Sequence, residues 1–253
     1  MASHRWIMAI CLAIMMIVGF FADVAYAEEG MTEEQWIVQG DSYFQKNEYD
    51  AAIASYAKAL EINPQNAGVY NNRALAYHAN GQYDLAIADY TKALKIDPRF
   101  AAAYSNRGAA YNAKEKYDQA IADCTKALNI DPRNAGAYNN RGNAYVFRGK
   151  YDQAIADYTK ALEIDPLFAD AYINRGNIYA IKWQFDRAID DYNQAIALNP
   201  NHAYVYFNKA HACEKIGRNR EAADAYRKFI EIAPVSSEKD VIFAKERLAA
   251  LGG

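Results

Sequence analysis

Apolar and small residues recur along most of the chain with a period of 34 residues. The period is marked by the six prolines, which are Pro64, Pro98, Pro132, Pro166, Pro200 and Pro234. A fixed period of this length indicates stacked structural repeats. Counted back from each proline, which we place at position 32, the repeats are 33–66, 67–100, 101–134, 135–168, 169–202 and 203–236.

Within each repeat the pattern predicts two helices. Position 4 is aromatic, position 8 is Gly or Ala, and position 11 is Tyr in every repeat but the last. This spacing puts the three positions on one stripe of a helix. Asp at position 18 in five repeats suits the start of a second helix, which carries Ala at position 20 and Tyr or Cys at position 24. Of the 21 tyrosines, all but Tyr26 and Tyr204 fall at positions 4, 11, 17 or 24, so we expect them in the core.

This arrangement of an aromatic and a small residue on the first helix, then Ala, an aromatic residue, Ala and Pro, resembles the tetratricopeptide repeat (TPR) family. The resemblance implies an all-α, right-handed superhelical α-solenoid of six helix-turn-helix TPR units. It also implies that the first helices line a concave groove that holds a peptide or a partner's helix. Residues 237–253 are predicted to be a capping helix and tail, because Val241, Ala244, Leu248 and Leu251 form one apolar stripe.

Residues 1–27 differ from the repeats and are typical of a secretory signal peptide. Arg5 precedes an uncharged apolar run over 6–22, and Ala25-Tyr26-Ala27 matches a cleavage site. The alternative is an uncleaved membrane anchor, because the run is long for a signal sequence. Either interpretation places the rest of the chain across a membrane, so we expect a periplasmic or secreted protein, or one anchored in the inner membrane. Residues 28–32 are then a short linker.

Arg at position 7 and Asp at position 23 occur together in the four middle repeats and are both missing from the first and last. We therefore predict an ion pair between the two helices of each middle repeat, with a structural role. The predicted pairs are Arg73 with Asp89, Arg107 with Asp123, Arg141 with Asp157, and Arg175 with Asp191.

Position 6 is Asn in five successive repeats, where we see no packing reason for it, and Asn is a poor helix former. By the geometry of the family this position faces the groove, so we predict a ladder of amides that bonds the backbone of an extended peptide. The alternative is a merely solvated helix face. An apolar side chain of the peptide would dock near Phe207. The predicted peptide-binding residues are Asn72, Asn106, Asn140, Asn143, Asn174, Asn177, Asn208, Phe147, Ile173, Tyr204 and Phe207.

Charge and motifs exclude several functions. With 28 Lys+Arg against 31 Asp+Glu the net charge is -3, which disfavours a nucleic-acid partner. We find no motif for a phosphate loop, a nucleophile or a metal, and therefore predict no catalytic residues, no cofactor and no enzyme. The expected function is a protein-protein interaction scaffold in the bacterial cell envelope, whose partner is a protein or peptide. The alternatives are a self-associating or membrane-tethered platform, with 6–22 as its only membrane contact, and a regulatory subunit of an enzyme complex.

Overall fold

The computed structural model describes residues 30–252, which are helical apart from turns and contain no strand within that range. The predicted signal peptide, residues 1–27, lies outside the described residues. The helices are α2 (Glu33–Gln45), α3 (Tyr49–Ile62), α4 (Ala67–Ala79), α5 (Tyr83–Ile96), α6 (Ala101–Ala113), α7 (Tyr117–Ile130), α8 (Ala135–Phe147), α9 (Tyr151–Ile164), α10 (Ala169–Ile181), α11 (Phe185–Leu198), α12 (Ala203–Lys215), α13 (Asn219–Ile232), the 3-10 turn η1 (Val235–Ser237) and α14 (Glu238–Ala250).

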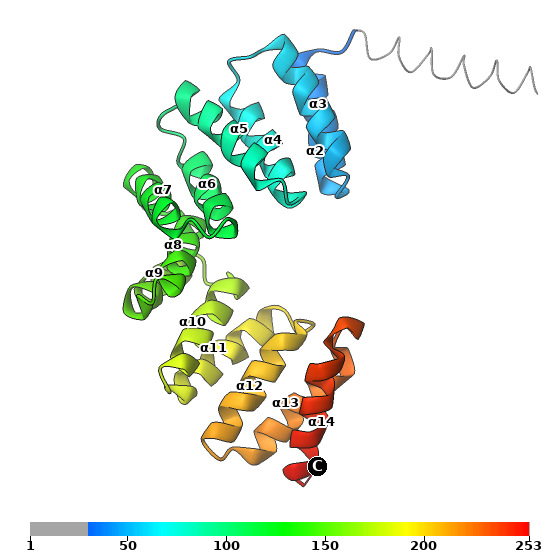
Figure 1. Ribbon diagram of the computed structural model, residues 1–253, viewed down its shortest axis with the longest axis vertical. Helices are drawn as coiled ribbons and strands as arrows, with labels where there is room; N and C mark the ends of the chain where they lie inside the picture. Colours follow the sequence, from blue (N-terminus) through cyan, green and yellow to red (C-terminus); the bar gives the residue numbers. More distant parts are fainter. Residues whose placement is uncertain (1–29, 253) are drawn as a thin grey trace, which may run out of the picture. The chain divides into compact units, whose positions relative to one another are not determined.

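The chain divides into two compact units, each a stack of helix pairs (Figure 1). The first unit ends at Ile96 and contains α2 to α5, and the second begins at Asp97 and contains α6 to α14. Within a pair the two helices pack along each other, and within each unit the second helix of a pair also packs against the first helix of the next pair. The predicted all-α solenoid of helix-turn-helix repeats is confirmed in this arrangement.

The two helices of every repeat are joined by a tight turn with one left-handed residue at position 15. Gly81, Gly149 and Gly217 have φ between 69° and 74°. The other three repeats place non-glycine residues in the same conformation, with φ of 61° at Asn47, 58° at Glu115 and 60° at Trp183. Such residues are uncommon at positive φ. The packing of the helix pair, rather than the presence of glycine, therefore fixes this turn.

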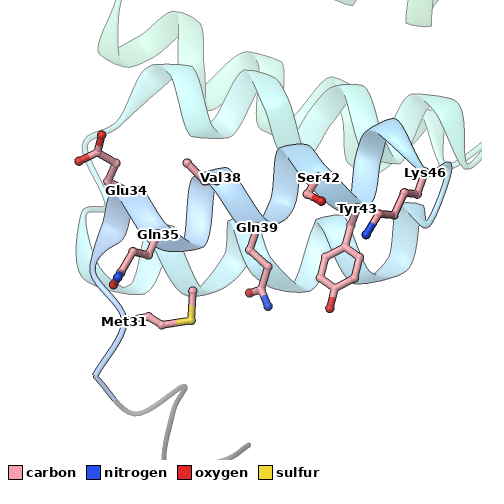
Figure 2. A pocket seen from close by; sticks show the side chains of 8 residues that line it. All are labelled: Met31, Glu34, Gln35, Val38, Gln39, Ser42, Tyr43 and Lys46. Carbon is pink, nitrogen blue, oxygen red and sulfur yellow. The ribbon is translucent and has the colours of Figure 1, made fainter.

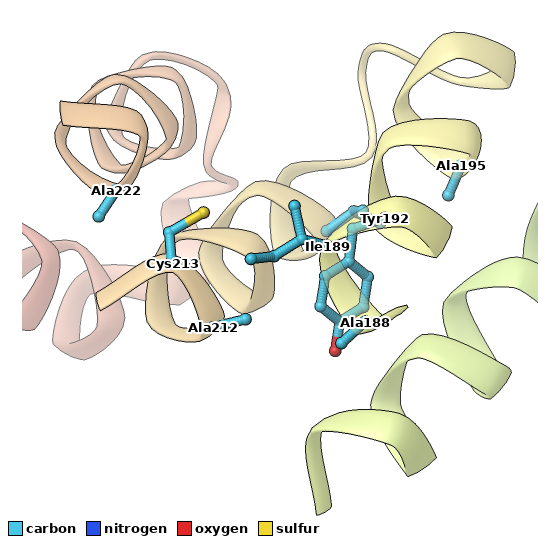
Figure 3. Close-up of a cluster of buried hydrophobic side chains, with 8 residues drawn as sticks. Ala188, Ile189, Tyr192, Ala195, Ala212, Cys213 and Ala222 are labelled. Carbon is cyan, nitrogen blue, oxygen red and sulfur yellow. The ribbon is translucent and has the colours of Figure 1, made fainter. Parts of the chain in front are cut away.

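The core is built from small residues that let helices approach and from aromatic residues that fill the space between them. Figure 3 shows one buried cluster, in which Ala188 and Tyr192 of α11 lie near Ala212 and Cys213 of α12. Close approach needs a small residue at position 8. A Cβ atom added to Gly142 would lie 2.7 Å from the Tyr158 ring, closer than such atoms come.

The first helix of the repeats, α2, has an outer face that is polar at positions where later repeats are apolar. Positions 3 and 10 of α4 pack against the preceding repeat, since Val69 and Ala76 lie in the core shared with α3. All later repeats have buried apolar residues at these two positions. The first repeat has Gln35 and Ser42 there instead, and this face can therefore remain in contact with water.

The C-terminal helix α14 covers the apolar surface at the end of the second unit. Ala244 is fully buried, and Val241, Leu248 and Leu251 pack on the cluster around Tyr226 and Phe229 of α13. The predicted apolar stripe of this capping helix is thus confirmed.

Candidate functional site

The four predicted Arg and Asp partners are joined by two parallel hydrogen bonds within each middle repeat. Arg141 Nε and Nη2 each lie 2.8 Å from an Asp157 carboxylate oxygen, and the other three pairs have distances of 2.6 to 3.0 Å. The Arg side chains are 14 to 18% exposed and the Asp side chains 5 to 7%. Each pair ties the first helix of a repeat to its second helix.

Two of these arginines in the second unit also contact the preceding repeat. Arg141 Nη1 donates to Thr125 Oγ1 at 3.1 Å, and Arg175 Nη1 donates to Thr159 Oγ1 at 3.0 Å. The hydrogen bond to Asp157 raises the pKa of Arg141, against the opposing effect of burial. These guanidinium groups therefore form the predicted ion pairs inside the stack.

The first helices of the second unit form one continuous face, which we call the first-helix face and define by α6, α8, α10 and α12. Asn140, Asn174 and Asn208 lie on it, half-buried, and their amide nitrogens bond the preceding first helix. Asn140 Nδ2 lies 3.3 Å from the Ser105 carbonyl oxygen, and Asn208 Nδ2 lies 3.0 Å from Asn177 Oδ1. The asparagines at position 6 thus do have a packing reason, contrary to our expectation, since they join successive repeats.

Asn174 is hydrogen-bonded to two residues of the preceding first helix. Its Nδ2 donates to Asn139 Oδ1 at 3.1 Å and to Asn143 Oδ1 at 3.2 Å. Asn139 is only 7% exposed, so it lies below the surface. In the first unit Asn72 Nδ2 reaches Asp41 Oδ1 at 3.5 Å in the equivalent way. Asn106 is half-buried on α6.

The acceptor at position 9 also receives a buried tyrosine hydroxyl from position 24 of its own repeat. Tyr158 Oη donates to Asn143 Oδ1 at 2.7 Å, and Tyr192 Oη donates to Asn177 Oδ1 at 2.9 Å. Burial raises the pKa of Tyr158, and its hydroxyl therefore remains a donor. Each set of position 24, position 9 and the next position 6 links three helices, and we call it the Tyr-Asn relay.

The relay is incomplete where position 9 carries no short polar side chain. Leu75 occupies it in the second repeat, and the buried Tyr90 hydroxyl there has no hydrogen-bond partner among the described residues. The third repeat lacks both members, with Ala109 at position 9 and Cys124 at position 24. The relay was not among the features predicted from the sequence, although this joint loss of Asn and Tyr in one repeat is visible there.

The predicted apolar docking residues differ in how much surface they offer. Phe147 is 67% exposed and stacks on Tyr117 with ring centroids 4.7 Å apart. Ile173 is half-buried against the α11 cluster. Tyr204 is 40% exposed, and its hydroxyl donates to Asp240 on α14.

Phe207 is enclosed by the chain's own aromatic residues. Its ring lies 5.0 Å from that of Phe229, 6.1 Å from that of Tyr226 and 5.9 Å from that of Phe243 on α14. The capping helix therefore covers much of the surface on which we expected an apolar side chain of a peptide to dock.

Two hollows lie at the ends of the helix stacks. One of about 700 Å³ runs along the outer face of α2 and is lined by Glu34, Val38, Ser42 and Lys46 among others (Figure 2). The other, of about 390 Å³, lies where α12 meets α14 and is lined by His211, Glu214, Lys215, Phe243 and Arg247. The second cavity could not be predicted from the sequence, because it depends on how α14 packs on α12.

Within residues 30–252 we find no cluster of His, Cys, Asp and Glu that could hold a metal ion. None of the described helices combines the length and the apolar character that a membrane span requires.

Comparison with curated proteins gives short matches. Serine/threonine-protein phosphatase 5 from Homo sapiens and from Rattus norvegicus is 46% identical over 44 residues, which is 17% of this chain. The match covers 9% of the phosphatase, so this chain spans only a small part of that enzyme.

Solved structures match over much more of the chain. The APC/C hetero-tetramer Cut9-Hcn1 gives a TM-score of 0.76 at 20% identity and covers 87% of this chain and 43% of that one. Pseudomonas aeruginosa pilF gives 0.73 at 20% identity, over 84% of this chain and 97% of that one. YrrB, described as a TPR protein with an unusual peptide-binding site, gives 0.58 at 26% identity, over 76% of this chain and 97% of that one.

Sequence profiles of the tetratricopeptide repeat match one after another along the chain. One profile matches 67–100, 101–134 and 169–202, a second matches 40–81 and 142–182, and a third matches 124–156 and 191–223. Together with the stacked helix pairs, these matches establish that the chain belongs to the tetratricopeptide repeat family, whose repeats are protein-interaction scaffolds.

Proposed function

We propose that this protein is a non-catalytic scaffold of the bacterial cell envelope that binds an extended segment of a partner protein across the first-helix face. The partner segment would cross α6, α8, α10 and α12 in turn. Repeats of this kind present a long surface built from equivalent positions.

The observation that carries the proposal is the orientation of the asparagine amides. The Nδ2 groups of Asn140, Asn174 and Asn208 are held by the preceding helix. Among the described residues no hydrogen bond reaches the Oδ1 atoms of these three side chains. These three side chains, which we call the asparagine strip, therefore offer fixed hydrogen-bond acceptors, which suit the N–H donors of a peptide backbone.

The spacing of the strip fits an extended chain. Packed helices lie roughly 8–10 Å apart, and an extended strand advances about 3.3 Å per residue. About every third residue of a partner segment would therefore meet one asparagine oxygen. Contacts to the backbone at this interval place few demands on the partner's sequence. The peptide-binding site in the description of YrrB supports the same kind of ligand.

Blocking the face tests the proposal better than removing the asparagines, because their loss would disturb the stack. Ala102 and Gly136 occupy position 2 of α6 and α8, and a Cβ atom at Gly136 meets only Asn134 Oδ1 at 3.5 Å. We expect the double variant Ala102→Arg/Gly136→Arg of residues 28–253 to fold and to lose partners captured from envelope extract.

The matched control places the same two arginines on second helices, at the exposed Ala122 of α7 and Ala156 of α9. Partners that are retained by the control and lost by the blocking variant would support the first-helix face. Equal capture by both variants would contradict the proposal.

The envelope location rests on the signal-like residues 1–27. N-terminal sequencing of the protein recovered from a bacterial host tests it. A chain that begins at Glu28 supports export with cleavage, and an intact chain in the membrane fraction supports an anchor over 6–22. An intact chain in the cytoplasm would contradict the proposed location.

A further inference from the structure

The cavity of about 390 Å³ between α12 and α14 is lined mainly by charged and polar side chains. Three of its lining residues, His211, Glu214 and Lys215, come from α12, and two, Phe243 and Arg247, come from α14. His211 stands three residues after Asn208, so the cavity lies next to the last asparagine of the first-helix face.

The one acidic group of this cavity is already fully engaged. Glu214 Oε2 accepts a hydrogen bond of 2.8 Å from Tyr226 Oη, and its Oε1 accepts one of 3.1 Å from Arg247 Nε. Arg247 Nη2 also donates to the same carboxylate. The hydrogen bonds from Arg247 lower the pKa of Glu214, which therefore stays ionised and paired.

The positive charge that remains for a ligand comes from Lys215 and Arg247. Lys215 is exposed and forms no ion pair in the described part of the chain. Burial lowers the pKa of His211, and its neutral ring offers a hydrogen bond rather than a charge. Glu214 holds the Arg247 guanidinium in place while leaving other N–H groups of it unbonded. A fixed guanidinium beside an ammonium group is suited to a carboxylate.

An apolar surface adjoins these cations. Phe243 is 41% exposed at the cavity, and its ring lies 5.9 Å from that of Phe207. A ligand that carries both a carboxylate and an apolar side chain would match the two halves of the lining. In an extended segment, side chains two residues apart point to the same side and can enter together.

We propose that this cavity binds an acidic side chain of the partner segment, with an apolar side chain two residues away on Phe243. The inference deepens the proposed function and rests on it, since the segment would reach the cavity from the first-helix face. It gives the partner a chemical signature that the asparagine strip alone does not give.

The test uses a fluorescein-labelled peptide, Ser-Phe-Ala-Glu-Ser-Ser, and a second peptide with Gln in place of Glu, both titrated into residues 28–253. We expect the Glu peptide to bind about tenfold more tightly, as the loss of one charge-assisted hydrogen bond implies. Equal binding of the two peptides, or no measurable binding of the Glu peptide, would overturn the inference.

Variants locate the effect. His211→Gln/Lys215→Gln should abolish the preference for Glu, whereas Lys245→Gln, which removes an exposed charge of α14 outside the cavity lining, should preserve it. Circular dichroism verifies that each variant is folded. A preference that survives in the His211→Gln/Lys215→Gln variant would also overturn the inference.

The two proposals fail differently. If the Ala102→Arg/Gly136→Arg variant loses partners but the cavity variant retains them, the first-helix face stands and the acidic signature is wrong. If the cavity variant loses partners and the blocking variant does not, the partner binds at the cavity without crossing the first-helix face, and the proposed function is wrong.

Discussion

At the scale of single residues, the polar side chains inside the stack work as connectors between helices. The Arg-Asp pairs join the two helices of one repeat, and the asparagines at position 6 join the first helices of neighbouring repeats. The Arg-Asp pairs are largely shielded from water and the asparagines are half-buried, and an unpaired charge or amide is costly where water is excluded. Their removal should therefore affect folding more than the loss of a surface ion pair does.

Replacing Arg141 with Ala leaves the Asp157 carboxylate without its partner, and this carboxylate is only 7% exposed in the unmodified protein. We expect the free energy of unfolding to fall by about 3 kcal/mol, as for other broken buried pairs. The control is Arg148→Ala, which breaks the exposed pair with Asp118 and should cost less than about 1 kcal/mol. Urea denaturation followed by circular dichroism measures both, and equal losses would contradict the account.

The Tyr-Asn relay provides a second residue-scale prediction. Tyr158→Phe removes the hydroxyl that donates to Asn143 and should destabilise the fold by about 1 kcal/mol. Tyr90→Phe removes a buried hydroxyl that has no partner among the described residues, so it should be neutral or stabilising. Thermal unfolding of the two variants decides the matter, and a larger loss for Tyr90→Phe would show that the relay contributes nothing.

At the scale of helices, the two ends of the array are finished by different means. The outer face of α2 is polar at the positions that later repeats bury, whereas α14 supplies an additional helix over α12 and α13. At positions 3 and 10 this end face gives no apolar contact to a further repeat or a second copy, although Val38 of the same helix is exposed.

Making the outer face of α2 apolar should therefore cause copies of the chain to associate with one another. The hollow along α2 is lined by three residues spaced four apart, which are Glu34, Val38 and Ser42. The side chain of Val38 is 63% exposed. Glu34→Leu/Ser42→Ile would complete an apolar stripe of three residues. Sedimentation velocity over a range of concentrations should show dimers or larger species that the unmodified chain lacks, and a variant that behaves like the unmodified chain would contradict this view of the end face.

The contact between α12 and α14 should depend on pH. Because Arg247 lowers the pKa of Glu214 in the folded protein, the pair stabilises the fold fully above the ordinary Glu pKa of about 4.3 and loses this effect as the pH falls below it. The melting temperature of Glu214→Gln should lie below that of the unmodified chain at pH 7, and the gap should narrow as the pH falls below the ordinary Glu pKa. A gap that is constant with pH would exclude this ion pair as its cause.

At the scale of the whole molecule, the sequence predicted the helices and their stacking because one pattern is repeated six times. The proline period, the small residue at position 8 and the aromatic residues fix helix pairs without any knowledge of contacts between distant residues. The Arg-Asp pairs could be anticipated for the same reason, since the two residues disappear together from the end repeats.

The details of the surface could not be predicted as well, because they depend on which of several possible hydrogen-bond and packing partners each side chain contacts. Nothing in the pattern says that Asn174 turns its amide nitrogen to Asn139 and Asn143, or that α14 encloses Phe207. The cavity at Arg247 likewise arises from the docking of one non-repeated helix. Such features follow from packing and not from periodicity.

The central claim is that partners contact the first helices and not the second. Photo-crosslinking in living cells tests it directly, with benzoylphenylalanine placed singly at Ala102 or Gly136 on first helices and at Ala122 or Ala156 on second helices. The account predicts crosslinked partner bands from the first two positions and none from the last two. Crosslinks from Ala122 and Ala156 alone would contradict it.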